Sequence, residues 1–397
     1  MAIKKIKQAV ILAAGKSTRT YPLTLNKPKP LLPVANKAIL QHNLEQLEKI
    51  VEEAIIVTGY EAQQIKDFLG KYRGIKTKTI QQIHQLGTGH ALLQAKPFLK
   101  DRFLVLNGDD LYSSADLTRL AAEQTAVLAA PALDFTKFGS IVQKQGRITI
   151  VEKPQQKVSE LSNTGAYVLD STVFDALKTV KKSPAGEYYL TDGVQGMPME
   201  VVTVKDYWLP IAYPWDLLDA NESILKKMKP IISKDAVIEK GATLLGSVSV
   251  GKGTIIRAGA YIQGPVLIGE NCIIGPNCFI RPATTIGNEC KVGNATEVKN
   301  SVMFDHAFAN HLTYVGDSIL GRHVNFAGGT ITANLRHDSQ NVSSMINGVL
   351  VSTGRKKFGC VCGDYAKTGI NTSIYPGRKI WPYKTTLPGE VVRKDVM

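Results

Sequence analysis

The sequence predicts an α/β domain followed by a left-handed parallel β-helix. In residues 8–228, short apolar runs alternate with helical patterns, which is typical of βαβ units and a mostly parallel, Rossmann-like sheet. After Pro230, aliphatic residues recur at every sixth position, which is typical of hexapeptide repeats in a β-helix. We therefore expect two domains, residues 1–229 and 230–382, and a C-terminal tail at 383–397.

The composition excludes several classes of protein. The chain has 397 residues, of which 44% are hydrophobic and 21% charged, as in a globular protein with more than one core. No apolar run approaches the roughly 18 residues of a membrane span, and the N-terminus lacks a signal-peptide core, so we expect a cytoplasmic protein. Five cysteines without a CxxC pair argue against disulfides or a zinc site.

The net charge of +14 is compatible with nucleic-acid binding, but Lys and Arg are dispersed along the chain. Small polyanionic substrates explain the charge at least as well. We therefore expect neither nucleic acid nor a membrane as a partner.

The elements of the first domain follow from local periodicity. Apolar runs predict strands, and apolar residues at helical spacing predict helices between them. Because ligands of such sheets bind beyond the carboxyl ends of the strands, motifs at those ends are candidate site residues. The expected strands are 9–12, 54–57, 79–81 and 103–106, and the expected helices are 39–50, 62–69 and 89–95.

The loop after the first strand is the strongest local signal. Residues 10–33 read VILAAGKSTRTYPLTLNKPKPLLP, an apolar run that ends in small residues and a Pro-bounded basic segment. Small residues let backbone N–H groups approach phosphate oxygens, and Arg19 and Lys29 add cations. The loop is neither a Walker A motif nor a GxGxxG motif. An ordinary strand-to-helix turn is the alternative to a nucleoside triphosphate site.

Two carboxylates are candidate metal ligands. Asp109, in the motif NGDD after the strand at 103–106, suits Mg²⁺, which usually takes one or two carboxylates plus substrate phosphates. A helix cap or a turn is the alternative role for this aspartate. For the second carboxylate we favour Asp216 in PWDLLDAN over its neighbour Asp219.

Four motifs in this half resemble those of sugar-1-phosphate nucleotidyltransferases: LAAGKSTRTYPLTLNKPKPLLP, QLGTGHA, EKP and GEYYLTD. The resemblance covers about residues 8–228 and is closest to the N-acetylglucosamine-1-phosphate uridyltransferase type. It implies that Arg19 and Lys29 are catalytic and that Asp109 and Asp216 hold Mg²⁺. It also implies nucleotide-binding residues Leu12, Ala13, Gly15, Gln82, Gly87 and Thr88, and sugar-phosphate-binding residues Gly139, Glu152, Lys153, Asn163 and Thr191.

The implied reaction is an in-line attack of a sugar phosphate oxygen on the α-phosphorus, with release of pyrophosphate. No side-chain nucleophile is needed, because the attacking phosphate is already an anion. The pattern departs from that of bacterial uridyltransferases, since Asp110 follows Asp109 and Asp216 stands where they have an asparagine. We therefore expect UTP or dTTP as the nucleotide and leave the base and the hexose open.

The repeat in the second half is unbroken over twelve positions. Twelve aliphatic residues stand six apart from Ile232 to Val298, and small side chains, three cysteines among them, follow four positions later. We expect the register to break after Val298 and to resume through Leu320, Phe326 and Thr332 to about Ile380. Left-handed β-helices of this family pack as trimers, so the resemblance implies a homotrimer.

Residues 281–338 resemble the acetyltransferase segment of bifunctional uridyltransferase/acetyltransferases, with HLTYVGD and GGTITAN at its core. The resemblance implies that His311 is the catalytic base, because imidazole can accept the proton of an attacking amine near neutral pH. It also implies acetyl-CoA as co-substrate. Residues 335–352 depart from the bacterial pattern, and this version looks more like archaeal members. The implied amino-sugar phosphate contacts are Arg281, Lys299, Tyr314 and Asn334.

Three functions are weighed. The first is a bifunctional enzyme that acetylates glucosamine- or galactosamine-1-phosphate and couples the product to UTP or dTTP. The second is a nucleotidyltransferase whose β-helix only trimerises or regulates. The third is a non-enzymatic assembly subunit. Motifs for both reactions in one chain favour the first function, and the catalytic and metal-binding residue types argue against the third.

Overall fold

The computed structural model describes residues 5–131 and 135–397. The chain divides into two compact units, each of which is described by itself. The division follows packing, whereas the boundary expected at 229/230 follows the change of sequence pattern, so that boundary stays a prediction. The first unit comprises Met1–Lys16, Lys27–Leu31 and Ala38–Pro210, and the second comprises Ser17–Asn26, Leu32–Lys37 and Ile211–Met397.

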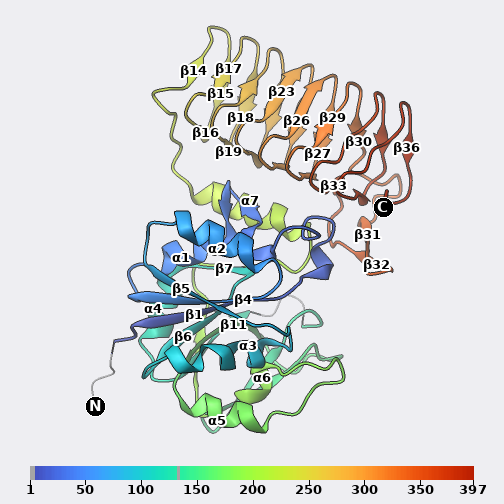
Figure 1. Ribbon diagram of the computed structural model, residues 1–397. Coiled ribbons are helices and arrows are strands. Elements are labelled where there is room, and N and C mark those ends of the chain that lie inside the picture. The colour runs from blue at the N-terminus through green and yellow to red at the C-terminus, as the bar shows by residue number, and fades with distance from the viewer. Residues whose placement is uncertain (1–4, 132–134) are drawn as a thin grey trace. The chain divides into compact units, whose positions relative to one another are not determined.

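The first unit is built on a mixed nine-stranded sheet (Figure 1). Strands β1, β4, β5 and β6 are parallel, as the alternating pattern predicts, whereas β11 is antiparallel to β6. In spatial order the strands are β10 (Arg147–Val151), β9 (Ser140–Lys144), β11 (Leu161–Leu169), β6 (Phe103–Asn107), β1 (Gln8–Ala13), β4 (Glu53–Thr58) and β5 (Lys76–Gln81), with β8 (Ala126–Pro131) beside β11 and β12 (Glu200–Thr203) beside β8.

Helices cover both faces of this sheet (Figure 1). Alternate side chains of β1 enter two cores: Ile11 packs with the helices of one face, and Val10 with those of the other. A strand buried on both faces reads as a continuous apolar run, which is why β1 is visible in the sequence. One face carries α1 (Ile39–Leu47), α2 (Ala62–Lys71) and α4 (Ser114–Ala121), and the other carries α3 (Thr88–Ala95) and α5 (Thr172–Thr179). The seven expected elements are confirmed, with ends shifted by up to three residues.

Short elements connect these layers. They are η1 (Thr18–Thr20), η2 (Lys29–Leu31), η3 (Lys96–Phe98), α6 (Leu190–Gly193), β2 (Pro33–Val34), β3 (Lys37–Ala38), β7 (Asp110–Tyr112) and β13 (Trp208–Pro210). None of the helices in the described ranges combines the length and the apolar character that crossing a membrane requires.

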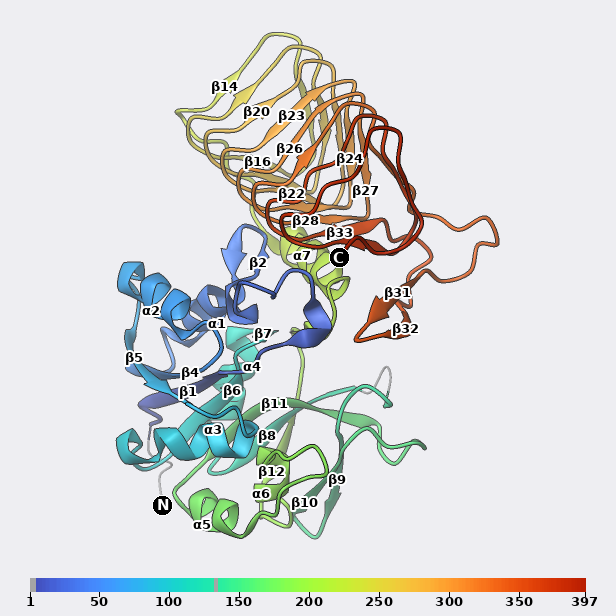
Figure 2. The ribbon, with the colours of Figure 1, turned by 45° about the vertical axis from the view of Figure 1, so that its right-hand side comes forward.

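The second unit contains three parallel sheets that form a left-handed β-helix (Figure 2). Each sheet takes one strand from almost every coil. The first sheet is β14 (Val237–Ile238), β17 (Ile255–Ile256), β20 (Ile273–Ile274), β23 (Lys291–Asn294), β26 (Phe308–His311) and β29 (Asn325–Phe326). The second is β15 (Thr243–Leu245), β18 (Tyr261–Gln263), β21 (Phe279–Arg281), β24 (Glu297–Lys299), β27 (Tyr314–Gly316), β30 (Ile331–Thr332), β34 (Ser373–Ile374) and β36 (Val391–Val392). The third is β16 (Val248–Val250), β19 (Val266–Ile268), β22 (Thr284–Ile286), β25 (Val302–Met303), β28 (Ile319–Leu320), β33 (Cys360–Cys362) and β35 (Arg378–Ile380).

The register of the coils matches the period of the sequence. Ile256 pairs with Ile274, 18 positions later, so three hexapeptides make one coil. The break expected after Val298 is confirmed, because Val298 pairs with Val315, only 17 positions later. The repeat is shortened by one residue there, and the core continues. The three cysteines of the repeat are buried in this core, and all five cysteines are free thiols.

The β-helix extends beyond its expected end. Strand β36 pairs with β34, and Val396 bridges to Ile380, so residues 383–397 form a further coil where the sequence suggests a tail. The six-residue spacing continues to the end, but a polar residue interrupts its aliphatic character. The buried positions of this last stretch are Ile374, Ile380, Thr386 and Val392.

Helix α7 (Asp216–Lys227) belongs to the second unit because a buried amide ties it to the β-helix. Asn221 Nδ2 donates to the carbonyl oxygen of Ala283 at 3.1 Å. Its Oδ1 accepts from Thr285 Oγ1 at 2.6 Å and from the backbone N–H of Ala35 at 3.1 Å. A buried amide without hydrogen-bond partners destabilises the folded state. These three hydrogen bonds therefore hold α7 in place against the β-helix.

Candidate active sites

The end of β6 presents Asp109 to a buried lysine. Lys29 Nζ donates to Asp109 Oδ2 at 2.7 Å, and Asp109 remains partly exposed. The preceding residue, Gly108, donates its N–H to the carbonyl oxygen of Leu12 at 2.9 Å. A Cβ on Gly108 would stand 2.8 Å from that oxygen, so the close approach of the two strand ends requires glycine.

The second aspartate of the NGDD motif has a different environment. Asp110 is buried, and its Oδ2 accepts from Trp208 Nε1 at 3.2 Å. Its carbonyl oxygen accepts from Asn43 Nδ2 at 2.9 Å. Asp110 therefore holds β7 and β13 in place, and Asp109 is the aspartate of this pair that a ligand can reach.

Three predicted nucleotide-binding residues share the turn before α3. Gln82 Nε2 donates to the carbonyl oxygen of Gly87 at 3.1 Å, and Thr88 Oγ1 accepts from the N–H of Leu190 at 2.9 Å. Gly87 has a φ of +93°, and a Cβ there would stand 2.6 Å from the carbonyl oxygen of Tyr188. The turn thus brings the three residues together, and it needs glycine at position 87 whether or not a ligand is bound.

Three predicted sugar-binding residues lie together where β9 and β10 meet β11. The N–H of Asn163 donates to the carbonyl oxygen of Gly139 at 2.7 Å. A Cβ on Gly139 would stand 3.2 Å from Glu152 Oε1, so the Glu152 carboxylate lies beside this glycine. Asn163 Nδ2 donates to the Tyr167 hydroxyl at 2.7 Å, which orients the amide.

The remaining predicted residues of the first unit are more scattered. Leu12 and Ala13 end β1, and no atom of the described residues lies within 4 Å of a Cβ built on Gly15. Packing therefore does not require glycine at position 15, which leaves open space beside this backbone. Lys153 is exposed, and Thr191 has a buried Oγ1 without a hydrogen-bond partner among the described residues.

In the second unit, Arg19 and Asp216 contact the same tyrosine. The guanidinium carbon of Arg19 lies 5.8 Å from the ring centre of Tyr213, within range of a cation–π contact. Asp216 Oδ2 accepts from the N–H of Tyr213 at 2.7 Å and from that of Ala212 at 2.8 Å. The Tyr213 ring stacks on Trp215 with ring centres 4.6 Å apart. Arg19 and Asp216 are thus gathered around one rigid aromatic pair.

The described carboxylates suit a metal that is bound largely by substrate. Residues 5–131 and 135–397 contain no group of three His, Cys, Asp or Glu side chains placed to hold an ion. Mg²⁺ often takes only one or two carboxylates, with phosphates and waters completing its shell. Asp109 fits that role, and Asp219 forms an ion pair with Arg355.

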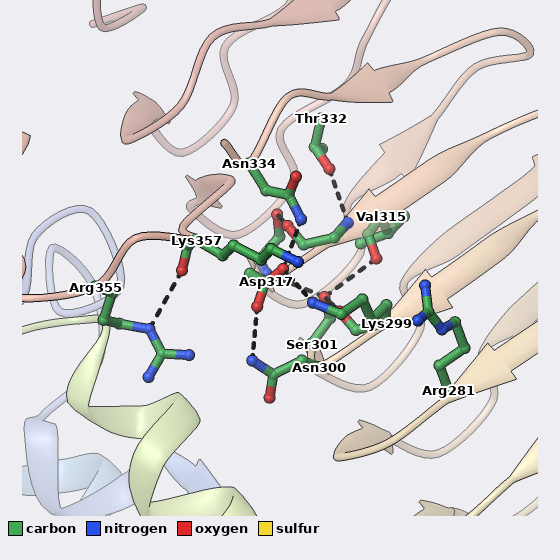
Figure 3. A network of polar contacts seen from close by, with 12 residues as sticks. Arg281, Lys299, Asn300, Ser301, Val315, Asp317, Thr332, Asn334, Arg355 and Lys357 are labelled. Carbon is green, nitrogen blue, oxygen red and sulfur yellow. Dashed lines mark hydrogen bonds and ion pairs between the residues drawn. The ribbon is translucent and has the colours of Figure 1, made fainter. Parts of the chain in front are cut away.

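A buried carboxylate joins the predicted acetyltransferase residues (Figure 3). Asp317 accepts from Lys299 Nζ at 2.9 Å, from Asn300 Nδ2 at 2.7 Å and from Asn334 Nδ2 at 2.6 Å. Asn334 Nδ2 also donates to the Tyr314 hydroxyl at 3.1 Å. A buried negative charge is stable when donors surround it in this way. The structure therefore brings together Lys299, Tyr314 and Asn334, with Asp317 at the centre.

Asp317 ends the motif HLTYVGD, but the sequence alone indicates no role for it. The residue has a φ of +49° at a corner of the coil, where an aspartate after glycine reads as an ordinary turn residue. Its partners lie on neighbouring coils, so its burial was not visible along the chain. The only local signal was a short polar side chain inside a segment that resembles a catalytic one.

Two further groups complete the arrangement. Arg281 is the register partner of Lys299 on the adjacent strand, and its Nη1 pairs with Glu297 Oε1 at 2.8 Å. Register partners point to the same face, so two cations stand side by side, as a phosphate requires. Burial raises the pKa of the Tyr314 hydroxyl, and the charge of Asp317 adds to the shift. Tyr314 therefore stays protonated at neutral pH.

His311 ends β26, three residues before Tyr314, and is exposed. Its carbonyl oxygen accepts from Thr313 Oγ1 at 2.7 Å and from the N–H of Gly329 at 3.3 Å. In the part of the chain that the structure describes, no group is hydrogen-bonded to its imidazole. The backbone is thus held, and the side chain is exposed.

Comparison with known proteins finds relatives that match nearly the whole chain. The bifunctional protein GlmU of Methanococcus vannielii is 40% identical over 400 residues, which cover 98% of this chain and 95% of that protein. The bifunctional sugar-1-phosphate nucleotidylyltransferase/acetyltransferase of Sulfurisphaera tokodaii is 34% identical over 404 residues, 98% of each chain. The crystal structure of UDP-glucose pyrophosphorylase with UDP-glucose matches with a TM-score of 0.51 and 23% identity over 56% of this chain and all of that one, which supports the fold alone.

The fold and the two sets of polar clusters define a nucleotidyltransferase joined to a hexapeptide-repeat acyltransferase. Residues 8–227 match the nucleotidyl transferase family, and residues 262–387 match the GMPPB C-terminal domain. This chain belongs to the nucleotidyl transferase family and, within it, to the archaeal-type bifunctional GlmU proteins, the sugar-1-phosphate nucleotidylyltransferase/acetyltransferases. The alternatives of a β-helix without an activity and of a non-enzymatic subunit are therefore set aside.

Proposed function

We propose that this enzyme acetylates glucosamine- or galactosamine-1-phosphate with acetyl-CoA and couples the N-acetylated product to UTP or dTTP, releasing pyrophosphate. The observation that carries the proposal is that each of the two units contains a charged cluster of its own. Lys29 and Asp109 meet at the end of β6, and Lys299, Tyr314 and Asn334 meet around Asp317 on the β-helix. Each cluster contains residues that the family pattern assigns to one of the two reactions.

For nucleotidyl transfer, an oxygen of the sugar phosphate attacks the α-phosphorus of the triphosphate, and pyrophosphate leaves. Arg19 and Lys29 offset the negative charge that collects on the phosphates in the transition state. The open space beside Gly15 supports close approach of the triphosphate to the backbone. We assign the nucleotide to Leu12, Ala13, Gly15, Gln82, Gly87 and Thr88.

Mg²⁺, when bound, neutralises phosphate charge and favours departure of pyrophosphate. We assign Asp109 and Asp216 as its protein ligands. The contact from Lys29 to Asp109 Oδ2 orients this carboxylate before any substrate is present. In this arrangement the same lysine lies close to the bound phosphates, and its positive charge offsets their negative charge.

On the sugar side, Glu152 accepts hydrogen bonds from the sugar hydroxyls, and the amide of Asn163 hydrogen-bonds the hydroxyls and the N-acetyl group. Lys153 acts on the sugar phosphate as a point charge. The fixed orientation of the Asn163 amide against Tyr167 supports this assignment, because a preset amide discriminates between sugars. Gly139 and Thr191 complete the proposed sugar site.

In the acetyl transfer, the amine of the sugar attacks the thioester carbonyl carbon of acetyl-CoA. His311 accepts the proton that the amine loses and returns it to the departing thiolate, so an amide and a free thiol are formed. Arg281 and Lys299 hold the sugar phosphate, while Tyr314 and Asn334 orient the ring. The unpartnered imidazole of His311, held by its backbone, supports the role of base.

The test uses two products read in parallel. His311→Ala abolishes thiol release and leaves pyrophosphate release from an N-acetylated substrate unchanged. Loss of both activities in a folded variant contradicts separate sites. His323→Ala is the matched control, since this histidine stacks on His306 and Tyr365 and lies outside the assigned acetyltransferase residues. A grid of nucleoside triphosphates against sugar 1-phosphates then identifies the base and the hexose.

We also propose that the chain forms a homotrimer through its β-helix, which light scattering can measure. Exposed apolar side chains on the first coils, such as Ile231, Val237 and Leu245, support an association surface on this part of the chain. The cytoplasmic location, and the absence of nucleic-acid and membrane partners, stay predictions of the sequence.

A further inference from the structure

The segment that departs from the bacterial pattern, residues 335–352, contains a β-hairpin. Strands β31 (Ser343–Ile346) and β32 (Val349–Ser352) pair antiparallel and are labelled in Figure 2. The two residues of the turn, Asn347 and Gly348, have φ values of +48° and +82°. A two-residue turn with positive φ at both positions matches the twist of the flanking strands, and Asn-Gly is the pair that favours it. The hairpin thus ends in a tight, well-defined turn.

Buried polar contacts fix the hairpin to the last coils of the β-helix. Lys379 is buried, and its Nζ donates to the carbonyl oxygen of Met345 at 2.6 Å. Ser344 is buried as well, and its hydroxyl donates to the carbonyl oxygen of Gly377 at 2.8 Å. Because buried hydrogen bonds are costly to break, the hairpin is held at a fixed place on the coils.

The turn of the hairpin contacts the segment that carries Arg19. Asn347 Nδ2 donates to Thr18 Oγ1 at 3.1 Å, and both residues belong to the second unit. Thr18 begins the short helix η1, in which Arg19 follows it. Thr20, in the same helix, is buried, and its hydroxyl donates to the carbonyl oxygen of Ser17 at 2.9 Å. Because these contacts hold the turns of η1 together, a contact at Thr18 acts on the placement of Arg19.

Phe358, which follows the hairpin in the chain, supports Arg19 through two aromatic rings. The Phe358 ring contacts Trp215 edge-on, with ring centres 5.8 Å apart, and both residues are buried. Trp215 stacks on Tyr213, and the Arg19 guanidinium lies over the Tyr213 ring. All four residues belong to the second unit. Because a buried ring cannot move without leaving a void, Phe358 fixes Trp215 and thereby the ring that Arg19 contacts.

A third contact reaches the helix that carries Asp216. Arg355 forms an ion pair with Asp219, which lies with Asp216 in the first turn of α7. The Asp219 side chain is 61% exposed, so we assign this pair a smaller share in the placement of the helix than the buried rings. Residues 335–358 thus supply three separate contacts to the elements that carry Arg19 and Asp216.

We propose that residues 335–358 of the β-helix position Arg19 for nucleotidyl transfer, with Phe358 and Asn347 as the positioning residues. The inference rests on the proposed role of Arg19 in that reaction. An arginine side chain has several rotatable bonds, and its charge lowers the barrier only where it is held beside the negative charge that develops. A fixed aromatic ring and a fixed neighbouring residue supply this restraint before any substrate binds. The β-helix unit thereby completes the nucleotidyltransferase site as well as carrying the acetyltransferase residues.

The experiment uses the full chain and measures pyrophosphate release with N-acetylglucosamine 1-phosphate and UTP as substrates. Phe358→Leu keeps an apolar side chain but loses the aromatic edge contact, and kcat is expected to fall about tenfold. Asn347→Gly keeps the turn but loses one hydrogen bond, and kcat is expected to fall about threefold. The KM for UTP is expected to change by less than about twofold, because the restraint acts on charge that develops in the transition state.

Two matched controls separate positioning from stability. Phe326→Leu makes the same change at a ring buried in the core of the β-helix, and Ser339→Gly replaces an exposed residue of the same segment with a φ of +54°. Both variants keep kcat for pyrophosphate release, whatever their effect on thermal unfolding. In the background Arg19→Ala, neither Phe358→Leu nor Asn347→Gly lowers kcat further, because both act through the same guanidinium.

Unchanged kcat in both Phe358→Leu and Asn347→Gly overturns the inference. So do losses that multiply with that of Arg19→Ala in the double variants, because the groups then act independently. If Phe358→Leu does not fold, Asn347→Gly carries the test, since that side chain is exposed. Failure of the proposed function has a different appearance: the wild type then releases no pyrophosphate, or Arg19→Ala leaves the rate unchanged. Either result also removes the basis of the inference.

Discussion

Two lysine–aspartate pairs in this molecule have the same chemistry and opposite surroundings. In the pair Lys29–Asp109, at 2.7 Å, the lysine side chain is 4% exposed and the aspartate 38%. In the pair Lys299–Asp317, at 2.9 Å, the lysine is 18% exposed and the aspartate 3%. The buried partner fixes the exposed one, and the exposed one remains available to a ligand. The first pair thus presents a carboxylate, which suits a metal ion, and the second presents an ammonium group, which suits a phosphate.

The largest effect is expected when the first pair loses its buried member, Lys29. Lys29→Ala removes a cation near the phosphates and frees Asp109 to move, so kcat for pyrophosphate release is expected to fall about 100-fold or more. Thiol release is expected to stay unchanged, because we assign it to the cluster around Asp317. Parallel product assays measure both. A comparable loss of the two activities contradicts the assignment of this pair to nucleotidyl transfer alone.

A third lysine extends the comparison, because it is buried with a backbone oxygen as its closest partner. Desolvation lowers the pKa of Lys379 from 10.5 to about 8, although Asp395 opposes the shift. Between those two values the unfolded chain holds a proton that the folded chain lacks, so the free energy of unfolding rises with pH, by about 3 kcal/mol in total.

Chemical denaturation at pH 7.5 and pH 10.5 measures this rise, and Lys379→Met is its control. The variant removes the titrating group and is expected to flatten the pH dependence over that interval. An equal slope in wild type and variant assigns the rise to other groups. Lys379→Met also removes the hydrogen bond from Lys379 Nζ to the carbonyl oxygen of Met345. That loss lowers stability at both pH values, so it does not alter the comparison of the two pH dependences.

A smaller effect is expected when the second pair loses the charge of its buried member, Asp317. Asp317→Asn keeps the shape but removes the charge that Lys299, Asn300 and Asn334 share, which is expected to cost about 2 kcal/mol of stability. The KM for the amino-sugar phosphate rises as well, since Lys299 and Asn334 lose their common anchor. Thermal unfolding and thiol-release kinetics measure the two effects. A variant with altered stability and an unchanged KM reduces Asp317 to a purely structural residue.

The smallest effect comes from a pair exposed on both sides. Lys252 and Asp235 lie on the same β-helix, 3.9 Å apart, with side chains 70% and 63% exposed. Asp235→Asn is expected to change stability by less than about 1 kcal/mol, because solvent screens exposed ion pairs. It therefore serves as the matched control for Asp317→Asn. Equal losses in the two variants contradict the view that burial gives the Asp317 pair its importance.

Local patterns predicted most elements, and long-range contacts explain the exceptions. The break after Val298 could be read from spacing, because a missing residue shifts every later position. The last coil was missed, because Thr386 replaces an aliphatic residue in the six-residue series although it is equally buried. Helix α7 was expected with the first domain, since nothing in its own sequence shows that Asn221 bonds to Ala283 and Thr285.

The candidate sites also contain residues that local motifs predict and residues that only long-range contacts identify. Arg19, Lys29, Asp109 and His311 stand in contiguous motifs, so their residue types and their neighbours sufficed to single them out. The choice between Asp109 and Asp110 needed the structure, because only packing against Trp208 shows that Asp110 is buried. The cavity that Arg336, Arg378 and Arg393 line could not be predicted, because these arginines come from three separate segments of the chain.

By itself, the sequence determined the two kinds of architecture and the motifs of both reactions. Alternating and six-residue periodicities are set by the direction in which successive side chains point, which is a local property of the backbone. The tertiary structure alone decided which charges are buried. Lys29 and Asp317 became the fixed members of their pairs only when distant strands and neighbouring coils packed around them, and burial depends on every element that packs, not on the residue's own neighbours in the chain.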